Sequence, residues 1–318
     1  MDIQLITGST QLQMPAVVGD IKWTLQRRGT AGQLTFTVVQ DETLSLTEGD
    51  PVALTVDGVH LFYGFVFTKK RSKDGTIEVT AYDQLRYLKN EDAVNFENKT
   101  ASQLIQMLAA DFELQCGDLD DTGYTIAAYG EESVTLFDAI LDALDETMQA
   151  TGQLYVLYDD FGKLTLKKIG SLKSNLLLDA ETAEDYSYES SIDTDTYNKV
   201  KLTYENEETG TRDVYIAQDS GNIGQWGVLQ YHESLSSDEG AAAKADALLG
   251  YYNRKTRKLS FKNALGDLTI RAGSTVGVYL QLDDMTISNY MMVEKVTHTF
   301  SLDSHLMDLI LIGGDFIA

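Results

Sequence analysis

The chain has 318 residues and a formal net charge of −24, with 49 acidic and 25 basic side chains. This length predicts two or three domains, and the acidic balance excludes an extended nucleic-acid-binding surface, which needs clustered lysine and arginine. No stretch approaches the roughly 18 apolar residues of a membrane-spanning helix, and the N-terminus lacks the pattern of a signal peptide.

The acidic residues are concentrated in the middle of the chain. Residues 1–90 carry ten acids and nine bases, residues 91–195 carry 23 acids and five bases, and residues 196–318 carry sixteen acids and eleven bases. Together with the change in hydrophobic period, this uneven charge predicts three domains with bounds at 1–95, 96–185 and 186–318.

The first third has the pattern of antiparallel β structure. Apolar residues alternate from Leu34 to Val39. Asp57-Gly58 and Asp74-Gly75 each separate two runs of strand-forming residues, and Asp-Gly supplies the positive φ angles of a type I′ hairpin turn. Several short strands at this spacing predict a small barrel or sandwich.

The middle third changes to a helical period. Thr100–Gln103 resembles a capping box, and apolar residues recur with helical spacing from Phe137 to Met148. Gly152 follows at the position of a left-handed C-cap. A hairpin with its turn at Asp159–Gly162 completes an expected acidic α+β domain.

The last third returns to strands, at Lys199–Tyr204 and Arg212–Ile216 and again after residue 258. One helix is expected over about residues 238–253. We expect Asp238 and Glu239 in its first turn and Arg254-Lys255 at its end, where these charges complement the helix dipole.

Two stretches of the chain look alike. Glu48–Leu54 parallels Ala272–Val278, and each is followed by a turn, a strand, a second turn and an alternating strand. Either any two β-meanders resemble each other at this level, or one module occurs twice. Duplication predicts a mainly β fold with an α+β insertion, that is, two tube-type β-barrel domains flanking an α+β domain. Three chains with such a duplication can make a pseudo-sixfold ring.

Six segments follow one another at a distinctive spacing: Tyr63–Val66, Asp74–Asn90, Lys99–Ser102, Asp121–Tyr124, Ala143–Thr147 and Tyr158–Leu164. Together they resemble the XkdQ/YqbQ-type hub proteins of tailed phages and defective prophages over essentially the whole chain. None of these segments is chemically specific by itself. That family is similar in architecture to the central hub of contractile-tail baseplates and to the base of type VI spike proteins.

The resemblance implies a structural baseplate hub subunit of a phage tail or a phage-tail-like contractile injection particle, such as a tailocin, which joins the hexameric tail tube to the trimeric spike. Its implied partners are further copies of itself in a homotrimer, the tail tube protein, the spike protein and baseplate wedge or LysM-type tail proteins. It also implies a place in the virion baseplate after synthesis in the bacterial host cytoplasm, no cofactor and no catalytic activity.

Motifs for catalysis, cofactors and metals have little support. Asp118–Gly123 superficially resembles a calcium loop, but Tyr129 occupies the position of the bidentate glutamate. Gly221–Gly227 lacks the pattern of a phosphate-binding loop and is expected to be a flexible loop with an aromatic anchor. Cys116, the single cysteine, has no accompanying histidine motif, and a lone thiol fits a reducing compartment. The histidines are scattered along the chain, at His60, His232, His298 and His305.

One local charge feature is the basic run Lys69, Lys70, Arg71 and Lys73, at or near a hairpin tip. It is either a solvated loop that blunts a sheet edge or a contact for an acidic surface on a neighbouring chain or baseplate partner. Exposed ion pairs are each worth less than about 1 kcal/mol, so several pairs are needed.

Two other functions stay open at this point. A receptor-binding or carbohydrate-binding tail protein would show aromatic-rich exposed loops, and a glycan screen would identify it. A cell-wall hydrolase needs paired carboxylates, which 49 acids supply by chance alone. Zymography would identify that activity.

Overall fold

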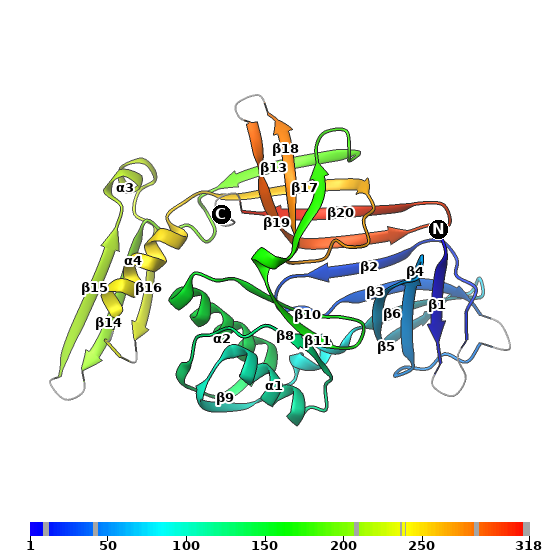
Figure 1. Ribbon diagram of the computed structural model, residues 1–318, viewed down its shortest axis with the longest axis horizontal. Helices are drawn as coiled ribbons and strands as arrows, with labels where there is room; N and C mark the ends of the chain where they lie inside the picture. The colour runs from blue at the N-terminus through cyan, green and yellow to red at the C-terminus, as the bar shows by residue number, and fades with distance from the viewer. Residues whose placement is uncertain are drawn as a thin grey trace. The chain divides into compact units, whose positions relative to one another are not determined.

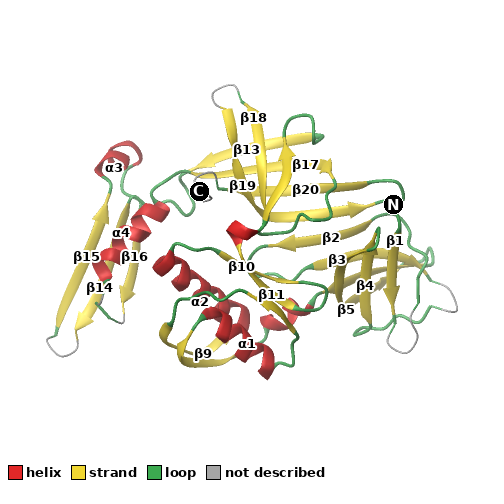
Figure 2. Cartoon of the chain, viewed as in Figure 1, coloured by secondary structure: helices red, strands yellow, loops and turns green. Residues whose placement is uncertain are grey.

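The computed structural model describes residues 1–8, 13–40, 44–206, 210–235, 237–238, 240–282 and 286–313. The fold is mainly β (Figures 1 and 2). The chain divides into a larger unit of residues 1–147, 153–187 and 259–318 and a smaller unit of residues 148–152 and 188–258. These bounds differ from those of the three predicted domains, and that division stays a prediction.

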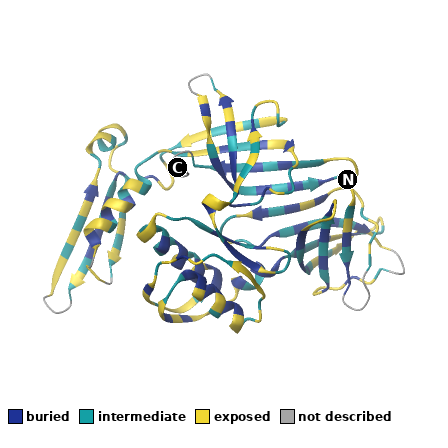
Figure 3. Ribbon diagram, in the orientation of Figure 1, coloured by how far each residue is buried: buried dark blue, intermediate teal, exposed yellow. Residues whose placement is uncertain are grey.

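Six strands of the larger unit form what we call the first repeat: β1 (Ile3–Thr7), β2 (Ile21–Gln26), β3 (Gln33–Val39), β4 (Pro51–Val56), β5 (Val59–Arg71) and β6 (Thr76–Tyr82). Their order in the sheet is β1-β4-β5-β6-β3-β2. In β3 the alternating residues Leu34, Phe36 and Val38 are buried, as their spacing predicts. Figure 3 shows this banding of buried and exposed residues along the strands.

Both predicted hairpins of this repeat are confirmed. β4 pairs with β5, and β5 pairs with β6, each antiparallel. Asp57 and Gly58 have φ angles of 49° and 78°, so both central residues of the first turn have the positive φ that a type I′ turn needs. In the second turn Asp74 accepts a hydrogen bond from the Thr76 N–H at 3.1 Å.

A second set of six strands forms the second repeat: β12 (Lys173–Leu178), β13 (Asp185–Ser191), β17 (Thr256–Leu265), β18 (Thr275–Gln281), β19 (Thr286–Phe300) and β20 (His305–Ile312). Their order in the sheet is β12-β18-β19-β20-β17-β13. Strand for strand this is the order of the first repeat. One difference is that β1 is antiparallel to β4 whereas β12 is parallel to β18.

The likeness extends to single hydrogen bonds around one glycine in each repeat. Gly49 and Gly273 have φ angles of 90° and 89°. In each repeat the glycine N–H donates to a valine carbonyl, and that valine N–H donates back to the residue after the glycine: Gly49 to Val66 (2.8 Å) and Val66 to Asp50 (2.9 Å), Gly273 to Val293 (2.8 Å) and Val293 to Ser274 (2.8 Å). The predicted duplication is therefore confirmed in strand order and in backbone geometry.

The two repeats do not form two separate barrels. β2 of the first repeat pairs with β19 of the second, so that the strands join into one 12-stranded sheet. Among the described strands this sheet does not close on itself. In the first repeat the physical reason is that β19 and β3 occupy the two edges of β2, so β2 cannot also pair with β1.

In the sequence, an α+β module is inserted between the two repeats. Its elements are the 3₁₀ helices η1 (Gln84–Lys89) and η2 (Ile169–Ser171), the strands β7 (Glu91–Lys99), β8 (Cys116–Leu119), β9 (Ile126–Thr135), β10 (Tyr155–Asp159) and β11 (Leu164–Lys168), and the helices α1 (Ala101–Asp111) and α2 (Leu136–Thr151). The capping box of α1 is confirmed, because Thr100 accepts from the Gln103 N–H and the Gln103 side chain accepts from the Thr100 N–H. Gly152 follows α2 with φ at 70°, as predicted.

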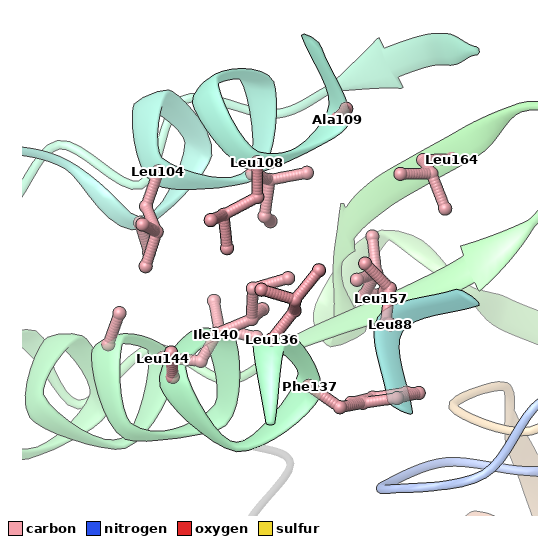
Figure 4. Packing of buried hydrophobic residues seen from close by; sticks show 14 of the residues in the cluster. Leu88, Leu104, Leu108, Ala109, Leu136, Phe137, Ile140, Leu144, Leu157 and Leu164 are labelled. Carbon is pink, nitrogen blue, oxygen red and sulfur yellow. The ribbon is translucent and has the colours of Figure 1, made fainter. Parts of the chain in front are cut away.

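The core of this module lies between its helices and strands. Figure 4 shows Leu104 and Leu108 of α1 facing Leu136 and Ile140 of α2. Leu157 and Leu164 of the β10–β11 hairpin lie at one end of the same cluster. The predicted apolar stripe of α2 is thus the buried face of that helix.

The smaller unit contains β14 (Lys199–Asn206), β15 (Thr211–Gln218), α3 (Ser220–Trp226), β16 (Gln230–Leu235) and α4 (Ala241–Tyr252). The predicted flexible loop at Gly221–Gly227 is wrong: α3 occupies it, because Asp219 caps the Asn222 N–H at 2.8 Å and Gly227 ends the helix with φ at 76°. The predicted charges on α4 are also displaced, since the helix begins after Asp238 and ends before Arg254. Glu239 lies outside the described residues.

Candidate assembly surface

The junction between the two repeats is an antiparallel ladder, which we call the seam, from Ile21 opposite Phe300 to Gln26 opposite Lys295. Just beyond it Arg27 binds Glu294 twice, with Nε 2.6 Å from the carboxylate and with the backbone N–H 2.9 Å from the carbonyl. The two side chains are only 12% and 24% exposed. Partial burial makes such a pair more specific in geometry than an ion pair in open solvent.

A buried histidine reinforces the seam from the second repeat. His298 stacks on Trp23 with ring centroids 5.0 Å apart and is fully buried. Its Nε2 lies 2.9 Å from the Ile270 carbonyl, so this nitrogen carries the proton, and Nδ1 accepts from His305 Nε2 at 2.9 Å. Burial lowers the pKa of His298 to about 3, and the ring is therefore neutral at physiological pH.

The basic run lies at the end of β5, where the sequence places it. Lys69 is largely internal: its Nζ donates to the Leu46 carbonyl at 2.6 Å and lies 3.2 Å from Glu48, and its side chain is 14% exposed. Hydrogen bonding at its own backbone and to Lys69 lowers the pKa of Glu48. Lys70 is 76% exposed and 3.9 Å from Glu78, and Arg71 and Lys73 are exposed. Contact with another chain stays a prediction.

Sequence reasoning missed a buried cluster that we call the acid junction. Asp83 accepts from the N–H groups of Gly32 (2.9 Å) and Leu85 (3.0 Å), and Asp159 accepts from Gln84 Nε2 (2.9 Å) and the Gly162 N–H (2.7 Å). Burial and the neighbouring Asp159 raise the pKa of Asp83, and burial raises the pKa of Asp159 to about 6. The available signals were the turn at Asp159–Gly162 and an aspartate in the N-cap position of η1.

The acid junction ties three parts of the larger unit together. Gly32 belongs to the first repeat, and Asp159 belongs to the α+β module. Arg271, which precedes β18 of the second repeat, lies over the Tyr158 ring at 4.0 Å and 3.7 Å from Asp160. The arrangement fixes geometry, and nothing in it resembles a nucleophile with its base.

The residues considered for metal or thiol chemistry have structural contacts. Asp118 and Asp120 both bind the Lys167 ammonium group, the second at 2.9 Å. Cys116 is an exposed residue of β8 whose pKa is raised by partial burial of the thiol, which makes it a weaker nucleophile. Within the described part of the chain no three His, Cys, Asp or Glu side chains are grouped to hold a metal. None of the described helices is both long and apolar enough to cross a membrane.

Solved structures define the class of fold. The 43 kDa tail protein of prophage MuSo2 from Shewanella oneidensis superimposes with a TM-score of 0.73 at 14% identity, covering 99% of this chain and all of that chain. An E. coli protein, described as a type VI secretion system component with structural similarity to the T4 tail proteins gp27 and gp5, gives 0.56 at 13% identity and covers 99% and 77%. The chain thus has the fold of phage tail proteins.

The sequence relatives identify the family. The model of the YqbQ-like family matches residues 21–312. In Bacillus subtilis strain 168, the uncharacterized protein YqbQ is 32% identical over 272 residues, which span 83% of this chain and 81% of that protein. XkdQ of the phage-like element PBSX is 31% identical over 271 residues, spanning 83% and 82%. The chain belongs to the YqbQ-like family, and the resemblance seen in the sequence is confirmed.

Proposed function

We propose that the protein is a structural hub subunit of a phage tail or a tail-like injection particle, with three copies forming a ring between the hexameric tube and the trimeric spike. The observation that carries the proposal is the repeat. Two equivalent six-stranded modules lie in one chain and are joined by the seam. Three chains present six modules, a number that matches both a sixfold and a threefold neighbour.

A repeat of this kind changes symmetry without any chemical step. The seam is a heterologous contact, because different surfaces of the two modules meet. Heterologous contacts close into a ring when each rotation is a whole fraction of a turn. In a ring of six modules, three seams lie within chains and three lie between chains. The two modules are not identical, since β1 is antiparallel to β4 whereas β12 is parallel to β18, and such a difference would repeat three times around the ring.

The remaining parts of the proposal follow from this position. The tail tube protein would lie on the sixfold face and the spike protein on the threefold face, with baseplate wedge or LysM-type tail proteins around the ring. The protein would be made in the host cytoplasm and would end in the particle baseplate. Neither a cofactor nor catalysis is part of this role. The net charge of −24 also suits the wall of a channel through which DNA passes, because an acidic wall repels the DNA phosphates and does not retain them.

The test is to locate and count the subunit in assembled particles. A short tag is inserted at Gly210, an exposed residue directly before β15. Labelled particles are then imaged by electron microscopy, and copies per particle are counted by quantitative mass spectrometry against the tube protein. We expect three copies, with label confined to the junction of tube and spike.

Other results would contradict the hub role. Label on peripheral fibres, with binding in a glycan screen, would indicate the receptor-binding or carbohydrate-binding alternative. Cleared zones in zymography with the purified chain would indicate a hydrolase. Six copies per particle would mean that each chain, and not each module, follows the sixfold symmetry of the tube.

A further inference from the structure

The seam uses one edge of a long strand. β18 pairs with residues 286–292 of β19, and β2 continues along the same edge at residues 295–300. β20 occupies the other edge. The second repeat thus accepts the last strand of the first repeat beyond the end of β18.

The first repeat has the same edge without an occupant among the described strands. Val66 and Val293 are equivalent, because each exchanges hydrogen bonds with its repeat's glycine turn. Residues 68–73 therefore correspond to residues 295–300. β4 pairs with β5 up to Phe65, and the described strands next to β5 are β4 and β6. The edge that begins at Thr68 contains the basic run.

The backbone groups at this edge are oriented for a further strand. The Ser72 N–H donates to the Thr76 carbonyl of the β5–β6 hairpin at 3.0 Å. Hydrogen-bonding direction alternates along an antiparallel strand, so Lys70 also bonds toward β6, and the N–H and C=O groups of Lys69 and Arg71 point to the opposite side. An edge with such groups is a template for another strand.

The complementary strand is at the other end of the sheet. β2 has β3 on one edge and β19 on the other. Its counterpart β13 has β17 on one edge and is the last strand in the sheet order. β13 contains Asp185 and Glu189 and no basic residue, and its residues are exposed or half-buried.

We propose that β13 of one copy pairs, antiparallel, with residues 68–73 of β5 in the next copy, and so repeats between chains the seam that β2 and β19 form within one chain. This inference rests on the proposed ring. With Ser187 opposite Arg71, the antiparallel direction brings Asp185 toward Lys73, while Lys69 keeps its contacts with Leu46 and Glu48. The occupant is a second copy because it alone continues an interface already built inside the chain.

Charge and hydrogen bonding act together at this junction. Main-chain pairing supplies the attraction, as in other cases of strand addition to a sheet edge. The acidic strand meeting the basic run fixes the direction and disfavours pairing of two β13 strands or of two β5 edges. The basic run is thus both an edge that resists pairing with itself and a specific contact.

Disulfide trapping in assembled particles tests the pairing. In a Cys116→Ser background, Arg71→Cys is combined in turn with Tyr186→Cys, Ser187→Cys and Tyr188→Cys, which covers one register on either side. Particles are oxidised and run on a non-reducing denaturing gel. We expect one of the three pairs to give covalent trimers. The matched control is Lys89→Cys with Ser187→Cys, because Lys89 is exposed but lies in η1, and it should stay monomeric.

The outcomes separate this inference from the hub role. Covalent trimers without larger species support both. A ladder that continues beyond trimers supports the pairing of β13 with β5 and overturns the closed ring. Monomers in all three pairs, in particles that contain three copies, overturn the pairing and leave the hub role standing.

A charge exchange gives an independent measurement. Lys73→Glu should lower incorporation into particles about fivefold, since the exposed pair with Asp185 becomes repulsive. Adding Asp185→Lys in the same chain should restore it. Unchanged incorporation on reversal, or no recovery in the double variant while it keeps its circular dichroism spectrum, would overturn the proposed contact.

Discussion

At the scale of single residues, the acid junction shows how burial changes a common side chain. Asp159 and Asp83 are 6% and 3% exposed, and their hydrogen bonds reach the first repeat and η1. Burial disfavours the charged form of a carboxyl group, so the group keeps its proton to a higher pH. The junction therefore makes the larger unit sensitive to pH at a point where its three parts meet.

The first prediction concerns Asp159→Asn. The pKa of Asp159 rises from 3.8 to about 6 on folding, so the folded state holds the proton more tightly than the unfolded chain. Its contribution to the free energy of unfolding falls as the pH rises from about 4 to about 6. Asparagine does not titrate, so the variant does not show this pH-dependent decrease in stability. Its stability relative to the unmodified protein should rise by about 2 kcal/mol between pH 4 and pH 7, as measured by urea unfolding. A difference that is independent of pH would contradict the assignment.

At the scale of elements, the glycine turns explain why the two repeats share a shape despite different sequences. A φ near 90° is open to glycine and strained for other residues. The turn holds the start of β4 or β18 against the middle of a long strand, and the rest of that strand is left free to pair elsewhere. One residue type at one backbone position thus fixes where this turn meets the long strand in each repeat.

The second prediction uses these glycines as a matched pair. Gly49→Ala should cost about 1–2 kcal/mol from backbone strain, because an added Cβ meets nothing within 4 Å. Gly273→Ala should cost about 1–3 kcal/mol more, because its Cβ would lie 2.6 Å from Val156 Cγ1. Chemical denaturation measures both. In a Val156→Ala background most of the extra cost should be lost, because only the Cβ of residue 156, at 3.0 Å, remains in the way; an unchanged extra cost would mean that the steric explanation is wrong.

At the scale of the whole molecule, the two units have unequal cores. The smaller unit is organised around a cluster of five buried apolar residues, namely Val200, Leu202, Ala217, Ala245 and Leu248. The α+β module of the larger unit alone has a much larger buried cluster. Local stability follows the amount of apolar surface that is buried.

The third prediction is that the smaller unit opens first. Backbone amides of β14 should exchange with deuterium about tenfold or more faster than those of β5 residues 61–66, because fewer buried contacts hold β14. Hydrogen exchange with mass spectrometry measures this on the intact chain. Equal protection of the two strands would mean that the units unfold as one.

The sequence by itself determined the elements and the family. Asp-Gly turns, the capping box at Thr100 and the stripe of α2 depend on neighbours a few residues away, and each is confirmed. The glycine stretches near Gly49 and Gly273 revealed the repeat for the same reason. The loop predicted at Gly221–Gly227 failed because the cap at Asp219 was not considered.

Only the tertiary structure decided how distant segments meet. The pairing of β2 with β19 joins residues more than 260 positions apart, and the contacts of Asp83 and Asp159 join three parts of the chain. A local sequence pattern does not indicate which distant edge a strand will pair with, because that pairing depends on how all the intervening elements pack. For the same reason the sequence indicated two barrels, whereas the strands of both repeats join in one 12-stranded sheet that does not close among the described strands.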